Sequence, residues 1–279
     1  QKEWLLNNKL NITIGGRLDK HSLYNFQFNP KLAVGYKAKP GLNFTGSIGT
    51  GFKAPDFRQQ FLYFTNSLVG YTLLGANELS NGLQQLQQQG QIDQSINIAP
   101  FLGNHKLVPE KSTGINVGVR YWLHHKTGFT LNIFRNDIKN LIDRYNLPFT
   151  KTNGQAIFSY VNLNKVFTQG FDVSIDHSIN KNFTAKAGYQ YLDAKDKDVV
   201  KRIKNGAVVK RDPVTYVSTY VTMAEYGGLF NRSKHTANLQ LFFISNNKKW
   251  NANIRANYRG RYGYNDINGD NILDDDREY

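Results

Sequence analysis

The acidic run near the end of the chain has the residue spacing of a calcium-binding loop. Four oxygen-bearing side chains fall at positions 1, 3, 5 and 9 of an EF-hand-like turn: Asp266, Asn268, Asp270 and Asp274. Asn271 stands at position 6, where such loops have glycine, and asparagine tolerates the left-handed backbone needed there. Arg277 stands at position 12, where a bidentate glutamate would close the site. The segment is therefore either a solvated acidic loop or a structural calcium site, and these four residues are the candidate ligands.

Histidine is the second candidate for metal chemistry. His105 lies in the run Gly103-Asn-His-Lys, and an exposed histidine of this kind could serve as an axial haem ligand. We therefore include His105 among the candidate ligand-binding residues, although most loop histidines bind nothing. His124 and His125 lie side by side in a predicted turn, where a transition-metal site would need further ligands.

Patterns that carry catalysis are missing from the sequence, which has no nucleophile elbow, phosphate loop, zinc motif or poised carboxylate pair. Asp172 and Asp176 share a strand face, but four residues along a strand span roughly 13 Å, too far for a shared proton. We expect no enzymatic activity and no required cofactor.

The composition favours an all-β protein with an anionic partner. Only 40% of the 279 residues are hydrophobic, and the apolar part is rich in aromatics, with 18 Phe and 16 Tyr. The chain has no cysteine, which excludes disulfides and thiolate metal sites. The net charge of +14 would attract an anion or lipopolysaccharide, and because no nucleic-acid motif is present we expect no nucleic-acid partner. The sequence has no apolar run of about 18 residues for a transmembrane helix, and its start has no signal-peptide pattern.

Alternating apolar and polar residues predict nine strands. They span residues 9–17, 31–36, 42–51, 114–122, 127–135, 170–178, 183–191, 236–243 and 250–259. The last of these places Arg255, Arg259 and three asparagines on one face, and so many polar groups need water on that side. Pro55 lacks a ladder donor and should end the strand that begins at Leu42.

Short and long connections alternate between these strands. Tight turns are predicted at residues 37–41, 124–127, 179–182 and 246–249, and longer loops at 21–29, 54–111, 143–156, 193–233 and 260–279. This alternation predicts an up-and-down meander with its long loops at one end. A soluble sandwich and a membrane barrel could both carry such a meander. Strands of about ten residues, short turns at one end and aromatics near strand ends favour the barrel.

Several motifs in order resemble the barrel of TonB-dependent outer-membrane receptors. They are Gly51–Gln59 (GFKAPDFRQ), Leu107–Ser112 (LVPEKS), a strand ending in Tyr121, Leu131–Ile142 (LNIFRNDIKNLI) and Tyr160–Val173 (YVNLNKVFTQGFDV). Together they cover most of residues 40–190, and the abundant Asn, Lys and Tyr are similar to receptors of Bacteroidetes-type bacteria. The resemblance implies an all-β fold, an antiparallel up-and-down transmembrane β-barrel of about 22 strands occluded by a plug. We therefore expect residues 1–279 to be a partial barrel that lacks both ends and the plug, because an open set of strands would leave bare edges in lipid.

The resemblance also implies which regions meet the ligand. The long loops near 54–111, 193–233 and 260–279 would be extracellular. Candidate ligand-binding residues in the loops and lumen are Arg58, Gln59, Tyr63, His105, Arg255 and Arg259. Within the first loop, Leu79, Leu83 and Leu86 predict a short amphipathic helix over residues 76–90, with Asn77 as N-cap and Gly90 as its end. Gly82 weakens this prediction.

The expected function is active import across the outer membrane of a Gram-negative bacterium, powered through TonB. A ferric siderophore or related metal chelate is the expected cargo, since basic loops such as Lys201–Lys204 would favour an anion. Expected partners are outer-membrane lipid and lipopolysaccharide, and the TonB complex through a missing N-terminal region. The alternatives are a passive porin-like barrel and a soluble extracellular glycan-binding β-protein.

Overall fold

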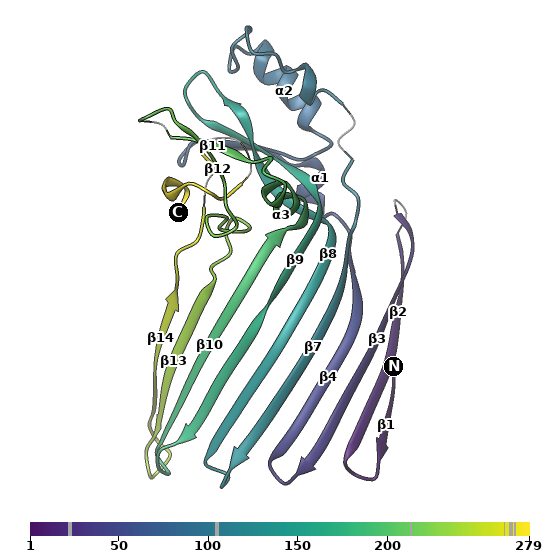
Figure 1. The fold of residues 1–279 in the computed structure, drawn as a ribbon, viewed down its shortest axis with the longest axis vertical. Helices are drawn as coiled ribbons and strands as arrows, with labels where there is room; N and C mark the ends of the chain where they lie inside the picture. The colour runs from purple at the N-terminus through teal and green to yellow at the C-terminus, as the bar shows by residue number, and fades with distance from the viewer. Residues whose placement is uncertain (22–23, 104–105, 213, 265, 268–269, 271) are drawn as a thin grey trace.

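Ten strands pair consecutively into one curved antiparallel sheet, which we call the wall (Figure 1). The computed structural model describes residues 1–21, 24–103, 106–212, 214–264, 266–267, 270 and 272–279. The wall strands are β1 (Lys2–Leu6), β2 (Leu10–His21), β3 (Tyr24–Lys39), β4 (Leu42–Lys53), β7 (Glu110–Leu123), β8 (Thr127–Thr150), β9 (Ala156–Ser178), β10 (Phe183–Asp196), β13 (His235–Ile244) and β14 (Asn251–Arg259). The meander is thus confirmed, with β1 as a strand that the residue pattern did not predict.

The two faces of the wall differ in polarity, as the alternation predicts. Phe44 pairs with Val119, and Val119 with Leu131, so one face is apolar across neighbouring strands. On the other face Asn43 pairs with Arg120, and Arg120 with Thr130. A hollow of about 340 Å³ opens on this polar face, which identifies it as the concave side. The convex side is therefore the apolar one, the arrangement of a membrane barrel.

The tight turns lie at one end of the wall, where the backbone explains their residues. Asn7 and Asn8 both have φ of 50°, and His124 and His125 have φ of 47° and 54°. Two successive left-handed residues form the centre of a type I′ turn, whose twist matches that of the flanking strands. Three residues separate Leu6 from Leu10, and three separate Leu123 from Thr127. The predicted turn at His124 is confirmed. No helix in the described ranges is long and apolar enough to cross a membrane.

Two predicted loops are largely strand instead. β8 and β9 extend the wall as a hairpin through Thr150 and from Ala156, whereas we predicted a loop over 143–156. β3 begins at Tyr24, whereas we predicted a loop over 21–29. Pro30 pairs with Gly16 of β2 and lies one residue beyond the last β3–β4 pair, Lys31–Gly49. A missing donor is tolerated where a strand becomes an edge.

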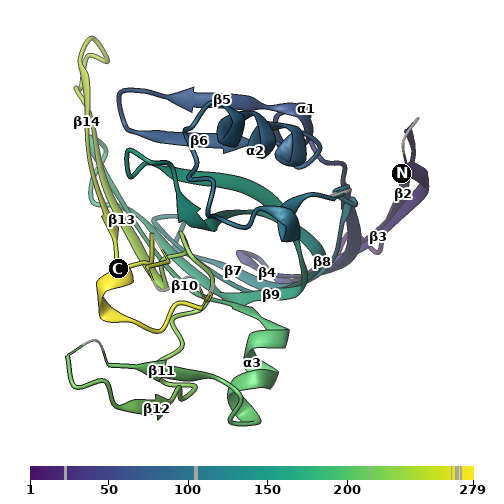
Figure 2. The same ribbon diagram turned by 90° about the horizontal axis from the view of Figure 1, so that it is seen from above.

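The remaining elements form two groups at the opposite end of the wall, on opposite sides of it (Figure 2). The inner loop unit, residues 54–109, lies above the concave side. It contains α1 (Phe57–Phe61), β5 (Tyr63–Asn66), β6 (Tyr71–Leu74), α2 (Leu79–Gln88) and η1 (Ala99–Phe101). The outer loop unit, residues 197–233 and 260–279, lies beside the convex side. It contains α3 (Lys197–Lys204), β11 (Val209–Arg211), β12 (Ser218–Tyr220) and η2 (Asp276–Glu278).

An apolar core holds the inner loop unit together. The helix α2 confirms the predicted amphipathic segment, and its three leucines are at most 1% exposed. Glu78 rather than Asn77 is the N-cap, and Gly90 ends the segment with φ of 69°. Gly82 belongs to the packing, because a Cβ there would lie 2.7 Å from Leu74 Cδ2.

A second core joins the parts of the outer loop unit. Val199 and Ile203 of α3 pack with Val208, Val221, Tyr226 and Ile272. Ile272 comes from the far end of the chain, so this core binds the C-terminal segment to α3. Asp196 caps α3 by accepting from the Asp198 and Val199 amides.

Candidate functional site

The base of the inner loop unit is fastened where three of the sequence motifs meet. The Asn162 side chain accepts from the Val108 amide and donates to the Val108 carbonyl, both at 2.9 Å. It also donates to the Asn140 carbonyl at 2.8 Å. Nearby, Lys53 Nζ lies 2.8 Å from Glu110 Oε1. The two ends of the long loop are thus held to the wall by side chains of the motifs themselves.

The tip of the inner loop unit is fastened to the β8–β9 hairpin. β6 adds to β9 as a parallel neighbour, with Thr72 opposite Ile157. Leu147 and Ile157 of the hairpin belong to the core formed by α2. Lys151 is 5% exposed, donates to Gln91 Oε1 at 3.0 Å, and burial lowers its pKa. The unit is therefore pinned at both ends rather than free to swing.

Residues 57–64 of the inner loop unit include several exposed aromatic rings and one exposed cation. Phe57 is 77% exposed, and Phe61, Tyr63 and Phe64 are also exposed. The Arg58 side chain is 77% exposed, and its guanidinium lies 3.6 Å from the Asp56 carboxylate, which is longer than a hydrogen bond. We call these five residues, 57, 58, 61, 63 and 64, the aromatic–basic surface. It includes the predicted Arg58 and Tyr63.

Gln59 has a structural task next to this surface. Its side chain accepts from the Asp56 amide at 2.9 Å, and Asp56 accepts from the Gln59 amide at 2.8 Å. This reciprocal pair is a capping box that starts α1. The spacing of Asp56 and Gln59, three residues apart, was the signal in the sequence. His105, another predicted ligand residue, lies outside the described residues.

Arg255 and Arg259 lie on the polar face of β14, as predicted. Arg259 stacks 3.8 Å above the Tyr262 ring and donates to the Asn231 carbonyl at 3.1 Å. Elsewhere on this face Lys186 pairs with Asp176 at 3.2 Å. The cavities found among the described residues do not unite Arg255 and Arg259 with Arg58 and Tyr63.

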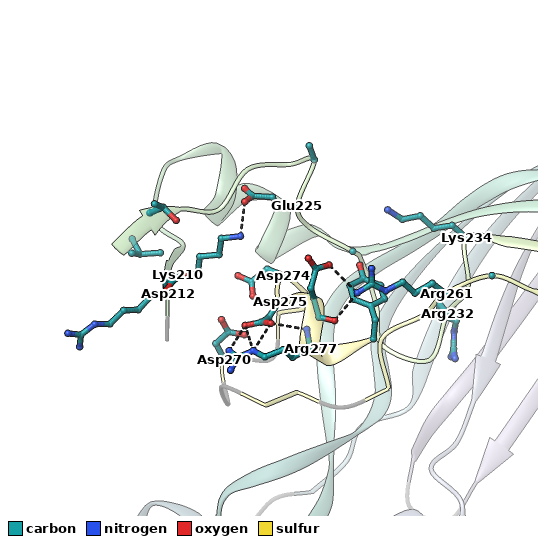
Figure 3. A pocket seen from close by; sticks show the side chains of 18 of the residues that line it. Lys210, Asp212, Glu225, Arg232, Lys234, Arg261, Asp270, Asp274, Asp275 and Arg277 are labelled. Atoms are coloured by element: carbon teal, nitrogen blue, oxygen red, sulfur yellow. Dashed lines mark hydrogen bonds and ion pairs between the residues drawn. The ribbon is translucent and has the colours of Figure 1, made fainter. Parts of the chain in front are cut away.

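A large charged pocket lies in the outer loop unit, which the residue pattern did not predict (Figure 3). Its volume is about 1390 Å³, between the β11–β12 hairpin and the C-terminal segment. Lys210 pairs with Glu225 at 2.7 Å, and Arg277 with Asp275 at 2.6 Å. These bonds lower the pKa of each carboxyl, Glu225 and Asp275, to about 2. Arg277 and Asp275 are two residues apart, whereas Lys210 and Glu225 are 15 residues apart. Only the fold brings the two pairs to the same pocket.

Two of the four predicted calcium residues, Asp270 and Asp274, line this pocket, whereas Asp266 lines a different cavity. Asp274 is 6% exposed, and neither of its carboxylate oxygens has a hydrogen-bond partner. Burial and the nearby Asp270 carboxylate raise the pKa of Asp274 to about 6. Asn268 lies outside the described residues. In the part of the chain that the structure describes, no three acidic or histidine side chains are close enough together to hold a metal ion.

The wall, with one apolar and one polar face, defines a membrane β-barrel protein. A sequence model of the TonB-dependent receptor-like β-barrel family matches residues 1–277. The chain therefore belongs to that family, which comprises transport receptors of the outer membrane rather than enzymes. The soluble alternative is thereby excluded.

The chain is also similar to individual proteins, at sequence identities of 24% or less. An iron-regulated outer membrane virulence protein of Vibrio cholerae serotype O1 is 24% identical over 203 residues, which cover 71% of this chain and 27% of that protein. The siderophore receptor PirA from Pseudomonas aeruginosa has a TM-score of 0.54 at 17% identity, over 92% of this chain and 39% of that one. The copper transporter OprC has a TM-score of 0.53 at 12% identity, over 91% and 32%. The chain thus spans about a quarter of the curated relative's length, and the structural likenesses show the fold alone.

Proposed function

We propose that the protein is an energy-dependent importer of an anionic metal chelate, with a ferric siderophore as the favoured cargo. The aromatic–basic surface is the observation that carries this proposal. Aromatic faces and a guanidinium suit the flat rings and negative charge of such chelates. Two relatives support an iron cargo by their names, an iron-regulated protein and a siderophore receptor.

The contacts that hold the inner loop unit in place also support a role of this surface in ligand recognition. The inner loop unit is pinned at its base by Asn162 and at its tip by β9. A surface held in place before the ligand arrives loses less entropy on binding, and so binds more tightly for the same contacts. Arg255 and Arg259 on the polar face would meet the cargo after it leaves the loops.

Energy from TonB is proposed for the whole protein on family membership alone, and no catalytic step is proposed. Uptake of ferric chelates by intact cells tests both the cargo and the energy source. We expect one chelate in a panel of catecholate, hydroxamate and citrate complexes to enter, and a protonophore to stop its entry. Uptake that continues with the protonophore would favour the passive porin-like alternative.

A variant pair locates the cargo site. Arg58→Ala should raise the apparent KM for the imported chelate about tenfold, because a charge-assisted contact is lost. Lys201→Ala removes an exposed cation from the convex side and serves as the control. Equal uptake by both variants would contradict a cargo site on the aromatic–basic surface.

We further propose that the outer loop unit contacts lipopolysaccharide. Lys201, Arg202 and Lys204 end α3, and the adjacent hairpin exposes Val214, Tyr216 and Tyr220 by 65% or more. Cations with exposed apolar side chains suit a layer of phosphates above acyl chains. Native mass spectrometry of receptor extracted with lipid tests this. Lys201→Glu with Lys204→Glu should reduce the bound lipopolysaccharide, whereas Arg58→Ala should not.

A further inference from the structure

Three lysines lie side by side on three neighbouring strands of the wall. In the sheet register Lys139 of β8 pairs with Lys111 of β7 on one side and with Lys165 of β9 on the other. Neighbouring strands lie roughly 4.8 Å apart, so the backbones of the three lysines span about 10 Å. All three residues are exposed. We call them the lysine row.

The lysine row has no salt-bridge partner among the residues that the structure describes. Asp137, two residues before Lys139 on β8, is already bonded to Arg135 at 3.0 Å and to Lys197 at 2.6 Å. Like charges directly opposite each other destabilise a sheet. An anion bound across the row would remove this repulsion, because it would be attracted to all three ammonium groups at once.

The lysine row lies on the convex face of the wall, beyond the apolar band. Alternate residues of a strand share a face, and on β8 those of the convex face run from Ile133 through Arg135 and Asp137 to Lys139. At the outer edge of the apolar band four rings contact one another: Phe171, Tyr189, Tyr191 and His235. Rings at this position form the aromatic girdle of a membrane barrel. The lysine row is therefore beyond the membrane boundary, on the side of the two loop units.

The height of the row indicates which anion reaches it. Lys139 lies four residues beyond Arg135, the first charged residue of β8 after the apolar band. That separation is roughly 13 Å along the strand, and about 10 Å along the membrane normal at a strand tilt of about 40°. The headgroups of a phospholipid bilayer add only roughly 5–8 Å to each side of the hydrocarbon core. The row thus stands above phospholipid phosphates, at the level of a larger phosphorylated headgroup.

We propose that the lysine row binds phosphate groups on the saccharide headgroup of lipopolysaccharide. Each ammonium group donates to phosphate oxygens, and such charge-assisted bonds are about twice as strong as neutral ones. This inference deepens the proposed lipopolysaccharide contact of the outer loop unit and rests on it. It does not depend on the cargo of the receptor.

The first turn of α3 stands beside the lysine row. This helix contacts β9 and β10 from the convex side (Figure 2). Its first residue, Lys197, reaches Asp137 of β8, and its last turn carries Lys201, Arg202 and Lys204. A headgroup with several phosphates can therefore contact the wall and the outer loop unit together.

The test is binding of purified lipopolysaccharide to the full-length receptor in detergent, measured by native mass spectrometry. The lysine variant combines Lys111→Gln, Lys139→Gln and Lys165→Gln. We expect its affinity for lipopolysaccharide to fall at least about tenfold, because each lysine near an anionic surface adds to the attraction. The control variant removes the same charge at the tight-turn end of the wall, through Lys126→Gln, Lys181→Gln and Lys249→Gln. Its affinity should change less than about twofold, because these lysines lie far beyond the screening length from the headgroup.

Thermal unfolding separates loss of the site from loss of the fold. Without lipid the lysine variant should have a Tm no lower than that of the wild type, because the substitutions remove repulsion between like charges. Lipopolysaccharide should raise the Tm of the wild type more than that of the variant. Dephosphorylated lipopolysaccharide should bind the wild type about as weakly as the intact lipid binds the variant.

Equal binding of intact lipopolysaccharide by the wild type and the lysine variant would overturn the inference. If Lys201→Glu with Lys204→Glu then reduced binding, the proposed contact of the outer loop unit would stand without the lysine row, and if it did not, both would fail. Phosphatidylglycerol is the comparison lipid. If the lysine variant lost phosphatidylglycerol as strongly as lipopolysaccharide, the occupant would be a phospholipid and the inference would be wrong.

Discussion

The inner and outer loop units stand at the same end of the wall but are held by different forces. The inner unit has a dry core of leucines and isoleucines, and its contact with the wall is made by backbone pairing and the Asn162 amide. The outer unit has a smaller core, and a pocket of ion pairs and an unpaired carboxylate lies at its surface. Apolar burial and backbone pairing are insensitive to salt, whereas exposed ion pairs are screened. The concave unit is thus built to stay rigid, and the convex unit to respond to ions.

The largest expected effect comes from the core of the inner unit. Leu83→Ala should destabilise this unit by about 2–5 kcal/mol, because it leaves a cavity at a position that is fully buried. Hydrogen exchange should accelerate in residues 54–103 and stay unchanged in α3. Leu68→Ala, at a side chain 97% exposed, is the matched control. Equal acceleration in both units would show that they unfold together and would break the comparison.

Removal of the Asn162 side chain should have the next largest effect. Asn162→Ala deletes three hydrogen bonds and should destabilise the base of the inner unit by about 1–3 kcal/mol. Limited proteolysis near residues 106–109 should become faster. Asn257→Ala, on the polar face of β14, removes an exposed asparagine and serves as control. A cleavage rate unchanged by Asn162→Ala would mean that the apolar core alone holds the unit.

Gly82→Ala tests how closely α2 packs. Alanine favours a helix by about 1 kcal/mol, but its Cβ would lie 2.7 Å from Leu74 Cδ2 in a core with no free space. We expect the steric clash to outweigh the helix preference, with a net loss of about 1 kcal/mol in the free energy of unfolding. Gln84→Ala changes an exposed position of the same helix and should be neutral or slightly stabilising. A stabilised Gly82→Ala variant would show that Leu74 can move aside.

The smallest effect is expected for the outer unit's exposed charges. Lys201→Ala should change stability by less than about 0.5 kcal/mol, because an exposed lysine on α3 contributes little to folding. Thermal unfolding of the variant and the wild type measures this change in stability.

Raising the salt from about 20 mM to about 500 mM should accelerate hydrogen exchange more in the outer unit than in the inner unit, because salt screens exposed ion pairs. If salt accelerated exchange more in the inner unit, ion pairs would be more important to the inner unit than to the outer one.

Much of the wall could be predicted from the sequence because strand alternation is a local signal. The residues from Leu42 to Gly51 alternate, and Pro55 correctly predicted that the strand would end, at Lys53. The leucines of α2 likewise predicted a helix with a buried face. The short strand β1 and the outward extensions of β8 and β9 were missed, since polar and irregular residues there do not alternate clearly.

The candidate sites could be predicted only in part. Arg58 and Tyr63 are exposed beside further aromatics that the sequence did not single out, and Gln59 is occupied in a capping box. The charged pocket could not be predicted, because Lys210, Glu225 and Asp274 are far apart in the chain. The acidic spacing pointed to calcium, but only burial distinguishes Asp274, which lacks a partner, from Asp275, which has Arg277.

The sequence by itself determined the family, the meander, and which face of each strand is apolar, because motifs and period-two patterns depend only on neighbours along the chain. The tertiary structure decided that the loop after Lys53 folds above the concave side while the loop after Asp196 folds beside the convex side (Figure 2). It also decided that Asn162 holds Val108 and that Ile272 packs with α3. These arrangements depend on contacts between residues dozens of positions apart, which burial and backbone pairing select only when the whole chain folds.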